Sequence, residues 1–231
     1  MMLHIIIPTL NAARTLPRLM ESLGPLDADY SVIVSDGGSS DDTLSVGIKA
    51  GARLAIGASG RGQQLCLGVH LAALTGETSD WYLFLHADCR LPPTWRRDVA
   101  TAMREGVPRY FRFRSDATGL RARILDGLVN FRSVGWGLPY GDQGLLISRA
   151  EYDRVGGFEP ISLFEDVDLV QRLSGLQPMP SALRTDIGAY LDQGLWQRGV
   201  RNLKLLKRFR NGDDIADLLR DYKQDGTRHE A

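Results

Sequence analysis

The chain has 231 residues, of which 43% are hydrophobic and 24% are charged, and its 28 Lys and Arg residues balance 28 Asp and Glu residues. This length allows one large domain with a full hydrophobic core and excludes a small disulfide scaffold. Zero formal net charge argues against a general nucleic-acid binder, because phosphate recognition needs a clustered excess of Lys and Arg. The two cysteines are predicted to be reduced thiols of a cytosolic protein.

The first residues predict a strand and not a signal peptide, because the apolar run Leu3 to Ile7 begins without a basic segment or a cleavage site. Later stretches are shorter than the roughly 20 apolar residues that a membrane-spanning helix needs. Any membrane contact is therefore expected at the surface.

Short β-branched runs alternate with helical patterns through the first half of the chain. Strands are predicted at 3–7, 31–35, 53–56 and 81–85, and helices at 15–23, 43–50 and 63–74. Such alternation predicts an α/β fold with a parallel sheet and crossover helices.

The second half is less regular. Alternating aromatic and basic residues at 109–114 predict an edge strand. Helices are predicted at 150–155, 166–173 and 195–210, and a frayed polar tail from Asp225 onward.

Polar residues follow three of the predicted strands directly. Pro8-Thr9-Leu10-Asn11 comes after the first, Asp36 after the second, and His86-Ala87-Asp88 after the strand at 81–85. Ligands of open α/β sheets bind at the carboxyl ends of the strands. These clusters are therefore predicted to be neighbours in space and to form a binding site.

Asp36 leaves its strand before the turn Gly37-Gly38-Ser39-Ser40. The segment could also be simply a turn into a helix. The glycines would allow the turn, and Asp41 or Asp42 would cap the helix. Such a turn does not need a carboxylate at Asp36, which could instead accept hydrogen bonds from a nucleoside.

His86 and Asp88 share one face if the extended backbone continues past the strand. Mg²⁺ and Mn²⁺ bind carboxylate oxygens, and Mn²⁺ accepts imidazole, so the pair is a candidate site for a divalent metal with a diphosphate. The alternative is a histidine bonded to backbone and an aspartate that caps the next turn. These residues by themselves leave both interpretations open.

Two further motifs stand at predicted helix starts. Arg61 lies between glycines, where a guanidinium suits an anionic ligand, although most Gly-Arg-Gly segments are simply turns. The adjacent carboxylates Glu165 and Asp166 either complement the helix dipole or supply a general base.

In order and approximate spacing, these motifs resemble those of the family-2 glycosyltransferases. The resemblance covers roughly residues 3 to 205 and also includes Gly141-Asp142-Gln143-Gly144 and Phe164-Glu165-Asp166-Val167-Asp168. It is closest to a bacterial branch of short soluble members with His-Ala-Asp in place of Asp-x-Asp. The family implies a GT-A fold, which is a Rossmann-like α/β domain with a mainly parallel central sheet flanked by helices, and C-terminal helices.

The resemblance also implies a domain plan and residue roles. One domain would span 1–225, with a nucleotide-binding half at about 1–115 and an acceptor half at about 116–225, and 226–231 would be a flexible tail. Pro8, Thr9 and Asn11 would line the nucleotide pocket, Asp36 would contact the base, and Arg61 would approach the diphosphate. Asp88, with His86, would hold Mn²⁺ or Mg²⁺, Asp142 and Gln143 would face donor and acceptor, and Asp166, supported by Glu165, would be the catalytic base.

The implied reaction moves one sugar from a nucleotide-diphosphate sugar to a hydroxyl acceptor with inversion. The sequence departs from the family at two positions. Ala12 stands in place of an acidic residue, and His86 stands in place of the first Asp of the metal motif. Because of these departures, a non-catalytic nucleotide-sugar sensor remains an alternative function. Retention of Glu165 and Asp166 favours the enzyme. A sugar-phosphate nucleotidyltransferase is a third candidate, for which Asn11-Ala12-Ala13-Arg14 is a poor phosphate loop.

The segment 195–210 combines basic residues with apolar ones at helical spacing and contains no acidic residue. Its predicted apolar stripe consists of Trp196, Val200, Leu203 and Leu206. The stripe either packs on the protein's own core or lies on an anionic membrane, where the acceptor would be lipid-linked. The expected location is the cytoplasm, with contact to the inner face of the membrane as the open alternative.

Overall fold

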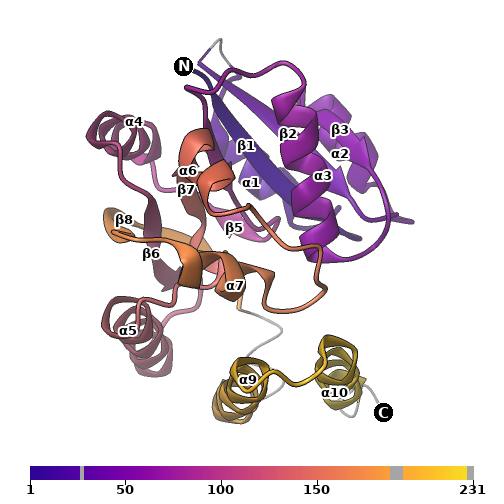
Figure 1. Cartoon of the computed structure of the whole chain (residues 1–231), viewed down its shortest axis with the longest axis vertical. Helices are drawn as coiled ribbons and strands as arrows, with labels where there is room; N and C mark the ends of the chain where they lie inside the picture. Colours follow the sequence, from indigo (N-terminus) through magenta and orange to yellow (C-terminus); the bar gives the residue numbers. More distant parts are fainter. Residues whose placement is uncertain (27–28, 188–194, 228–231) are drawn as a thin grey trace.

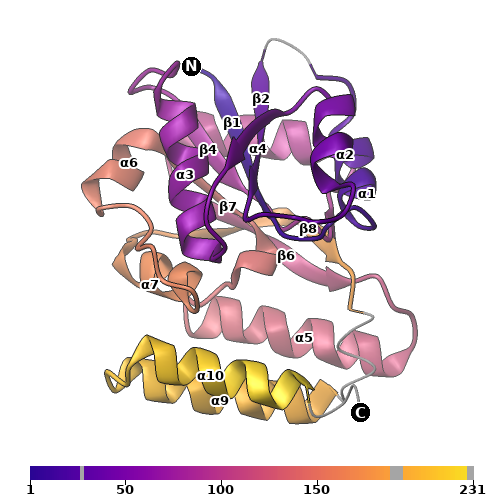
Figure 2. The same ribbon diagram turned by 90° about the vertical axis from the view of Figure 1, so that its right-hand side faces the viewer.

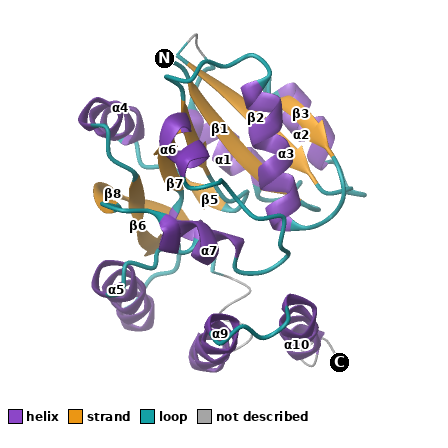
Figure 3. Ribbon diagram, viewed as in Figure 1, coloured by secondary structure: helices purple, strands orange, loops and turns teal. Residues whose placement is uncertain are grey.

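The centre of the structure, a computed structural model that describes residues 1–26, 29–187 and 195–227, is a sheet of eight strands. The strands are β1 (Leu3–Thr9), β2 (Tyr30–Asp36), β3 (Arg53–Ile56), β4 (Trp81–Phe84), β5 (Cys89–Arg90), β6 (Arg109–Ser115), β7 (Leu145–Ser148) and β8 (Gln177–Thr185). Their order across the sheet is β3-β2-β1-β4-β7-β6-β8-β5. Figure 3 separates these strands from the helices and loops around them.

Helices pack against the sheet and extend beyond one of its ends. They are α1 (Leu16–Leu23), α2 (Thr43–Lys49), α3 (Arg61–Ala73), α4 (Trp95–Glu105), α5 (Leu120–Gly135), the 3-10 helix η1 (Gly141–Gln143), α6 (Arg149–Arg154), α7 (Glu165–Arg172), α9 (Leu195–Arg210) and α10 (Ile215–Thr227). Helices α5, α9 and α10 run in similar directions along one end of the molecule, far from the N-terminus (Figures 1 and 2).

The first half of the chain forms the predicted parallel sheet. Strand β1 pairs in parallel with β2 and β4, and β2 pairs in parallel with β3. Ile5 and Ile7 pack on one side with Leu16 of α1, whereas Ile6 packs on the other side with Leu65 of α3. Both faces of β1 are therefore covered, which explains why its sequence is a continuous apolar run.

The second half makes the sheet mixed, because β7 is antiparallel to both β4 and β6 and β5 is antiparallel to β8. The prediction of an edge strand at 109–114 is wrong, since β6 lies between β7 and β8. Its alternation reflects the two sides of the sheet: Phe111 and Phe113 are buried, whereas Arg112 and Arg114 are exposed.

The elements that were not predicted from the sequence include α4, β8 and α10. Helix α4 buries Trp95, Val99 and Ala102 at helical spacing. It is capped by Gly106, whose positive φ of 71° ends the helix. Helix α10 continues to Thr227, past the predicted beginning of the tail, and residues 228–231 lie outside the described part of the chain. The division into two halves stays a prediction.

Helix α9 has the predicted bounds, but its apolar stripe is placed differently. Leu206 is buried as predicted, together with Leu205, whereas Val200 and Leu203 are exposed. The side chain of Trp196 lies outside the described residues. The predicted stripe therefore only partly packs on the core of the protein.

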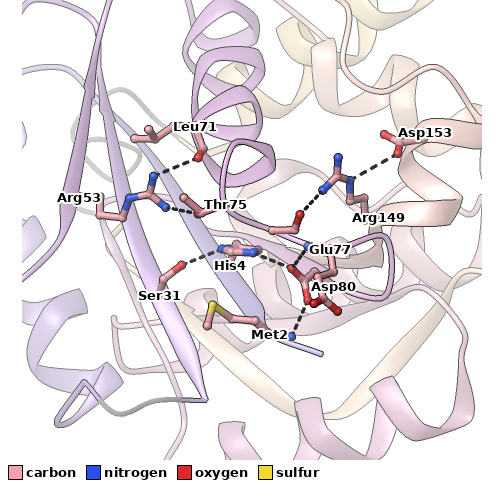
Figure 4. Close-up of polar contacts among 11 residues, drawn as sticks. Met2, His4, Ser31, Arg53, Leu71, Thr75, Glu77, Asp80, Arg149 and Asp153 are labelled. Atoms are coloured by element: carbon pink, nitrogen blue, oxygen red, sulfur yellow. Dashed lines mark hydrogen bonds and ion pairs between the residues drawn. The ribbon is translucent and has the colours of Figure 1, made fainter.

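A buried polar cluster fixes the amino end of β1 (Figure 4). The Asp80 carboxylate accepts hydrogen bonds from the backbone N–H groups of Met2 and Glu77, both at 2.7 Å, and contacts Nε2 of His4 at 3.2 Å. Nδ1 of His4 lies 2.8 Å from Oγ of Ser31. Burial would raise the pKa of Asp80, but these hydrogen bonds outweigh it and lower the pKa. The cluster lies at the end of β1 opposite its carboxyl end.

Candidate active site

The loops that follow β1 and β2 are tied together by hydrogen bonds. The Asn11 N–H donates to Oγ of Ser39 at 2.8 Å, and the Ser40 N–H donates to Oδ1 of Asn11 at 2.9 Å. Asp41 accepts hydrogen bonds from the N–H groups of Ala13 and Thr43, whereas the side chain of Asp42, at the N-cap position of α2, makes no capping hydrogen bond among the described residues. Asn11 has a positive φ of 50°, a conformation that asparagine tolerates well. The two clusters are neighbours in space, as predicted.

Asp36 is fully buried, and both of its oxygens are occupied by this turn. Oδ1 accepts hydrogen bonds from the N–H groups of Gly38 and Ser39, and Oδ2 accepts from the hydroxyls of Thr9 and Ser39. Burial would raise the pKa of Asp36, but the hydrogen bonds from Ser39, Thr9 and Gly38 together lower it. In this structure Asp36 organises the turn, and its contact with a base stays a prediction.

His86 and Asp88 lie together after β4, in a turn that follows the end of the strand. Nδ1 of His86 is 3.1 Å from Oδ1 of Asp88, so the pair differs from the alternative in which the histidine bonds to backbone. Burial would raise the pKa of Asp88, but the hydrogen bond from His86 and the charge interactions with His86 and Arg61 together outweigh it and lower the pKa. Asp88 is therefore a carboxylate at neutral pH.

Arg61 begins α3 and forms an ion pair with Glu165 of α7, with 3.0 Å between Nε and Oε1. Burial raises the pKa of Glu165 although the positive charge of Arg61 lowers it, and the negative charge of Asp166 raises it further. Arg61 keeps its charge, because the surrounding carboxylates outweigh the effect of burial and raise its pKa.

The glycines on both sides of Arg61 have structural reasons. Gly60 has a φ of 139° at the start of α3. At Gly62, an added Cβ would lie 2.3 Å from the carbonyl oxygen of Ile161 and 2.6 Å from that of Glu159. Gly62 therefore lets the loop before α7 approach α3, and this approach brings Arg61 to the carboxylates of α7.

Asp166 lies in the first turn of α7 and contacts η1. Its Oδ2 accepts a hydrogen bond from the Gly141 N–H at 2.6 Å, and its Oδ1 accepts one from the N–H of Val167 at 2.7 Å. The guanidinium of Arg61 occupies the space beside Gly141, where a Cβ would lie 1.7 Å from one of its nitrogens. Arg61, Gly141 and Asp166 therefore form one packed unit.

Asp142 and Gln143 differ in what they can offer a ligand. Burial raises the pKa of Asp142, and its Oδ1 is buried with no hydrogen-bond partner among the described residues. Gln143 is fully buried and turned inward: its Oε1 accepts from Oγ of Ser133 at 2.6 Å, and its Nε2 donates to the carbonyl of Phe111. Gln143 thus ties η1 to α5 and β6, and its contact with donor or acceptor stays a prediction.

Three adjoining hollows follow this edge of the sheet, and Pro8 lines all of them. The first, of about 280 Å³, is lined by Asn11, His86 and Asp88 among others. The second, of about 360 Å³, is lined by Thr9, Arg61 and His86, and also by Leu219 of α10. The third is lined by Arg61, Tyr140 and Asp166.

The structure therefore brings most of the predicted site residues to one place, with Asp36 and Gln143 supporting the site from inside. Sequence reasoning missed Leu219, because the pattern did not predict the helix that carries it. It also missed Gln64, whose buried side-chain amide donates to the carbonyl oxygens of Thr9 and Ser35. A glutamine in a helical pattern gives no sign of such a role.

Solved structures with the same architecture define the class of fold. Staphylococcus aureus TarS (residues 1–349, in complex with UDP) superposes with a TM-score of 0.59 at 16% identity over 84% of this chain and 64% of that chain. Glucosyl-3-phosphoglycerate synthase from Mycobacterium tuberculosis, in complex with Mn²⁺, UDP and glucosyl-3-phosphoglycerate, superposes with a TM-score of 0.54 at 22% identity, over 80% of this chain and 70% of that chain. The fold is the GT-A glycosyltransferase fold, as predicted.

The sequence comparison narrows the class to a family. The profile described as Glycosyl transferase family 2 matches residues 4–124, and the chain belongs to this family. A PGL/p-HBAD biosynthesis glycosyltransferase of Mycobacterium bovis (strain BCG / Pasteur 1173P2) is 38% identical over 97 residues, which cover 38% of this chain and 35% of that protein. The match thus spans about a third of the relative's length.

Proposed function

We propose that this chain transfers a single sugar from a nucleotide-diphosphate sugar to a hydroxyl acceptor, with inversion at the anomeric carbon and with help from a divalent metal. The observation that carries the proposal is the arrangement of charged groups around the three hollows that Pro8 lines. Asp88 lies in the first, Arg61 in the second and third, and Asp166 in the third. A donor diphosphate would thus meet a cation, and an acceptor hydroxyl would meet a carboxylate.

Arg61 suits the diphosphate. It stands in the first turn of α3, where the backbone N–H groups and the helix dipole also favour an anion. Its charge is balanced in this structure by Glu165. A bound diphosphate would share this cation, and Glu165 would hold the guanidinium in position.

The residues after β4 fit a divalent metal that takes its other ligands from the substrate. Among the described residues, no three His, Cys, Asp or Glu side chains are grouped so as to hold a metal ion, so the chain itself would supply Asp88 and His86. Mg²⁺ and Mn²⁺ commonly use one or two carboxylates together with substrate phosphates and water. Such an ion supplies charge neutralisation to the leaving diphosphate. The M. tuberculosis neighbour, whose complex contains Mn²⁺ and UDP, supports this proposal.

Asp166 is the proposed general base. It lines the third hollow, and the hydrogen bonds from Gly141 and Val167 hold its carboxylate in place. It would take the proton of the acceptor hydroxyl while the C–O bond to the sugar forms on the face opposite the leaving diphosphate. Positioned proton abstraction contributes roughly 10²- to 10⁴-fold to such a rate.

The test of this role compares two carboxylates of the same helix. Asp166→Asn keeps the shape of the side chain and removes its basicity, whereas Asp168→Asn alters a carboxylate that pairs with Arg172 on α7. We expect Asp166→Asn to reduce sugar transfer from a panel of nucleotide sugars by at least 100-fold with donor affinity nearly unchanged, and Asp168→Asn to retain most of the activity. Full turnover in Asp166→Asn would move the base to another residue, with Glu165 the first to test.

The metal proposal has its own test. Calorimetric titration of nucleoside diphosphate with and without Mn²⁺ should show metal-dependent binding that Asp88→Ala abolishes. Asp153→Ala, which removes an exposed carboxylate paired with Arg149 on α6, is the matched control and should bind as the unmodified chain does. Equal affinity of Asp88→Ala with Mn²⁺ would remove the metal from this position.

A further inference from the structure

Helix α5 turns an apolar face away from the protein. Its buried side is marked by Ala122 and Ser133, and Asn130 hydrogen-bonds the backbone of β6 at Phe113. The opposite side carries exposed apolar side chains, which continue into the residue that follows the helix. They are Leu120 (74% exposed), Ile124, Leu128, Phe131 (67%), Val134 and Trp136 (58%).

This stripe has helical spacing, because Leu120, Ile124 and Leu128 are four residues apart and Phe131 and Val134 follow at intervals of three. An amphipathic helix normally turns its apolar stripe toward the core, whereas here a second apolar stripe is exposed, opposite a core side made of Ala122, Leu125, Val129 and Ser133. A contiguous exposed apolar patch of this kind marks an interaction site.

Helix α9 lies at the same end of the molecule as α5 (Figures 1 and 2). Leu205 and Leu206 turn toward the core, so that Val200, Leu203, Lys204 and Lys207 are left on the exposed side. Two other cations of α9 are engaged with α10: Arg201 lies over the ring of Tyr222, and Arg208 pairs with Asp213 and Asp221. The exposed side of α9 thus presents lysines beside apolar side chains.

The exposed charges of α5 and α9 have one sign, whereas the neighbouring α10 carries both signs, with Asp217 paired to Arg220. Arg121 and Arg123 are exposed on the two flanks of the α5 stripe. The sequence of α9 contains no acidic residue, and the single acid of α5, Asp126, turns inward and accepts a hydrogen bond from the Ser115 N–H. The complementary partner is therefore negatively charged and offers apolar material as well.

A bilayer of anionic lipids offers both negative charge and apolar material, whereas the same face of a second copy of this chain offers only apolar material. In a two-fold symmetric dimer the same face would meet itself, so the cations of one copy (Arg121, Arg123, Lys204 and Lys207) would be brought toward the cations of the other. None of the described helices is long and apolar enough to cross a membrane. Contact with a bilayer would consequently be made in the interfacial plane.

We propose that the exposed face of α5 and α9 docks on an anionic lipid surface. Leu120, Phe131 and Trp136 insert among the headgroups, and Lys204 and Lys207 bind lipid phosphates. A short loop joins Trp136 to Gly141 of η1, so docking would hold the Asp166 side of the site near the lipid. If the proposed sugar transfer holds, the acceptor is lipid-linked, but docking itself does not depend on that reaction.

The experiment is co-sedimentation of the full chain with lipid vesicles, without donor or acceptor. We expect binding to phosphatidylcholine vesicles that contain a quarter phosphatidylglycerol, much weaker binding to pure phosphatidylcholine, and a steep loss of binding between 50 and about 500 mM salt. Each cation contributes about fivefold to partitioning, so Lys204→Glu/Lys207→Glu should weaken it by about 25-fold or more. Leu120→Ser/Phe131→Ser should weaken it on the order of 100-fold.

Matched controls lie on α2, where Ile48 and Lys49 are also exposed. Ile48→Ser and Lys49→Glu should bind vesicles as the unmodified chain does, and thermal melting confirms that all variants fold. The proposal is overturned if the unmodified chain binds neither vesicle, binds both equally, or keeps its binding in the face variants. It is also overturned if light scattering shows a dimer that the face variants dissociate. Each of these results leaves the sugar-transfer proposal untouched, because no substrate is present.

Discussion

The ion pair between Arg61 and Glu165 offers a test of how the site is held together. Arg61→Met keeps the apolar stem of the side chain and removes the charge that lies 3.0 Å from Oε1 of Glu165. Breaking a buried pair by removing one partner costs about 3–5 kcal/mol, because the remaining charge is left uncompensated. The Glu165 side chain is 3% exposed and that of Arg61 31%, so water reaches one side of the pair. We therefore expect the free energy of unfolding to fall by about 2–3 kcal/mol.

The assay is urea denaturation at two pH values. Arg61→Met removes the positive charge that lowers the pKa of Glu165, so the folded-state pKa of Glu165 rises further above the unfolded value. A carboxyl group with a raised folded-state pKa binds its proton more tightly in the folded protein, so stability increases as the pH falls. The deficit of Arg61→Met should consequently be smaller at pH 5 than at pH 8.

Two further variants make the test selective. Arg61→Met/Glu165→Gln removes both charges and should recover at least about 1 kcal/mol of the loss. Arg154→Met breaks an exposed ion pair with Glu151 and should change stability little at either pH. If Arg61→Met unfolds at the same urea concentration as the unmodified chain, the pair does not hold the site in the way argued above.

Further predictions concern single positions and can be checked by thermal or urea unfolding. Gly62→Ala should lower the free energy of unfolding by about 1–3 kcal/mol, because the added Cβ would lie 2.3 Å from the Ile161 carbonyl oxygen. The control is Gly127→Ala in α5, where an added Cβ meets nothing within 4 Å and should stabilise by roughly 0.5–1 kcal/mol. Equal effects of the two variants would contradict the close approach at Gly62. Asp80→Ala leaves the N–H groups of Met2 and Glu77 without their acceptor and should cost about 2–4 kcal/mol at pH 7. The folded-state pKa of Asp80 is lowered, so its contribution to stability is present above the unfolded pKa and is lost as the pH falls through the folded pKa. The difference in unfolding free energy between Asp80→Ala and the unmodified chain should therefore shrink in acid. A difference that stays constant with pH would argue against an ionised Asp80.

The parallel half of the fold could be predicted from the sequence because its strands are short, mostly apolar runs. Leu3–Ile7 and Trp81–Phe84 are covered on both faces, and the helices between them show regular apolar spacing. The carboxyl-end rule then placed Asn11 beside Ser39 without any knowledge of side-chain contacts.

The rest depends on contacts between distant parts of the chain. Nothing near Arg61 in the sequence indicates that Glu165 is its partner, and nothing in the Gly141-Asp142-Gln143-Gly144 motif indicates that Gln143 turns inward to Ser133. An apolar stripe on a helix normally faces the core, so only the structure could show that Phe131 of α5 is exposed.

The most direct measurement for the proposed function is a thermal-shift panel of nucleotide sugars and nucleoside diphosphates, each with and without Mn²⁺. A ligand at about 100 times its dissociation constant adds roughly 2.7 kcal/mol to folding stability, which gives a readily detected rise in melting temperature. We expect one nucleotide class to raise the melting temperature of the unmodified chain, more strongly with Mn²⁺, and Asp88→Ala to lose the metal-dependent part. A panel in which no nucleotide shifts the melting temperature, with or without Mn²⁺, would contradict a nucleotide-sugar site at this edge of the sheet.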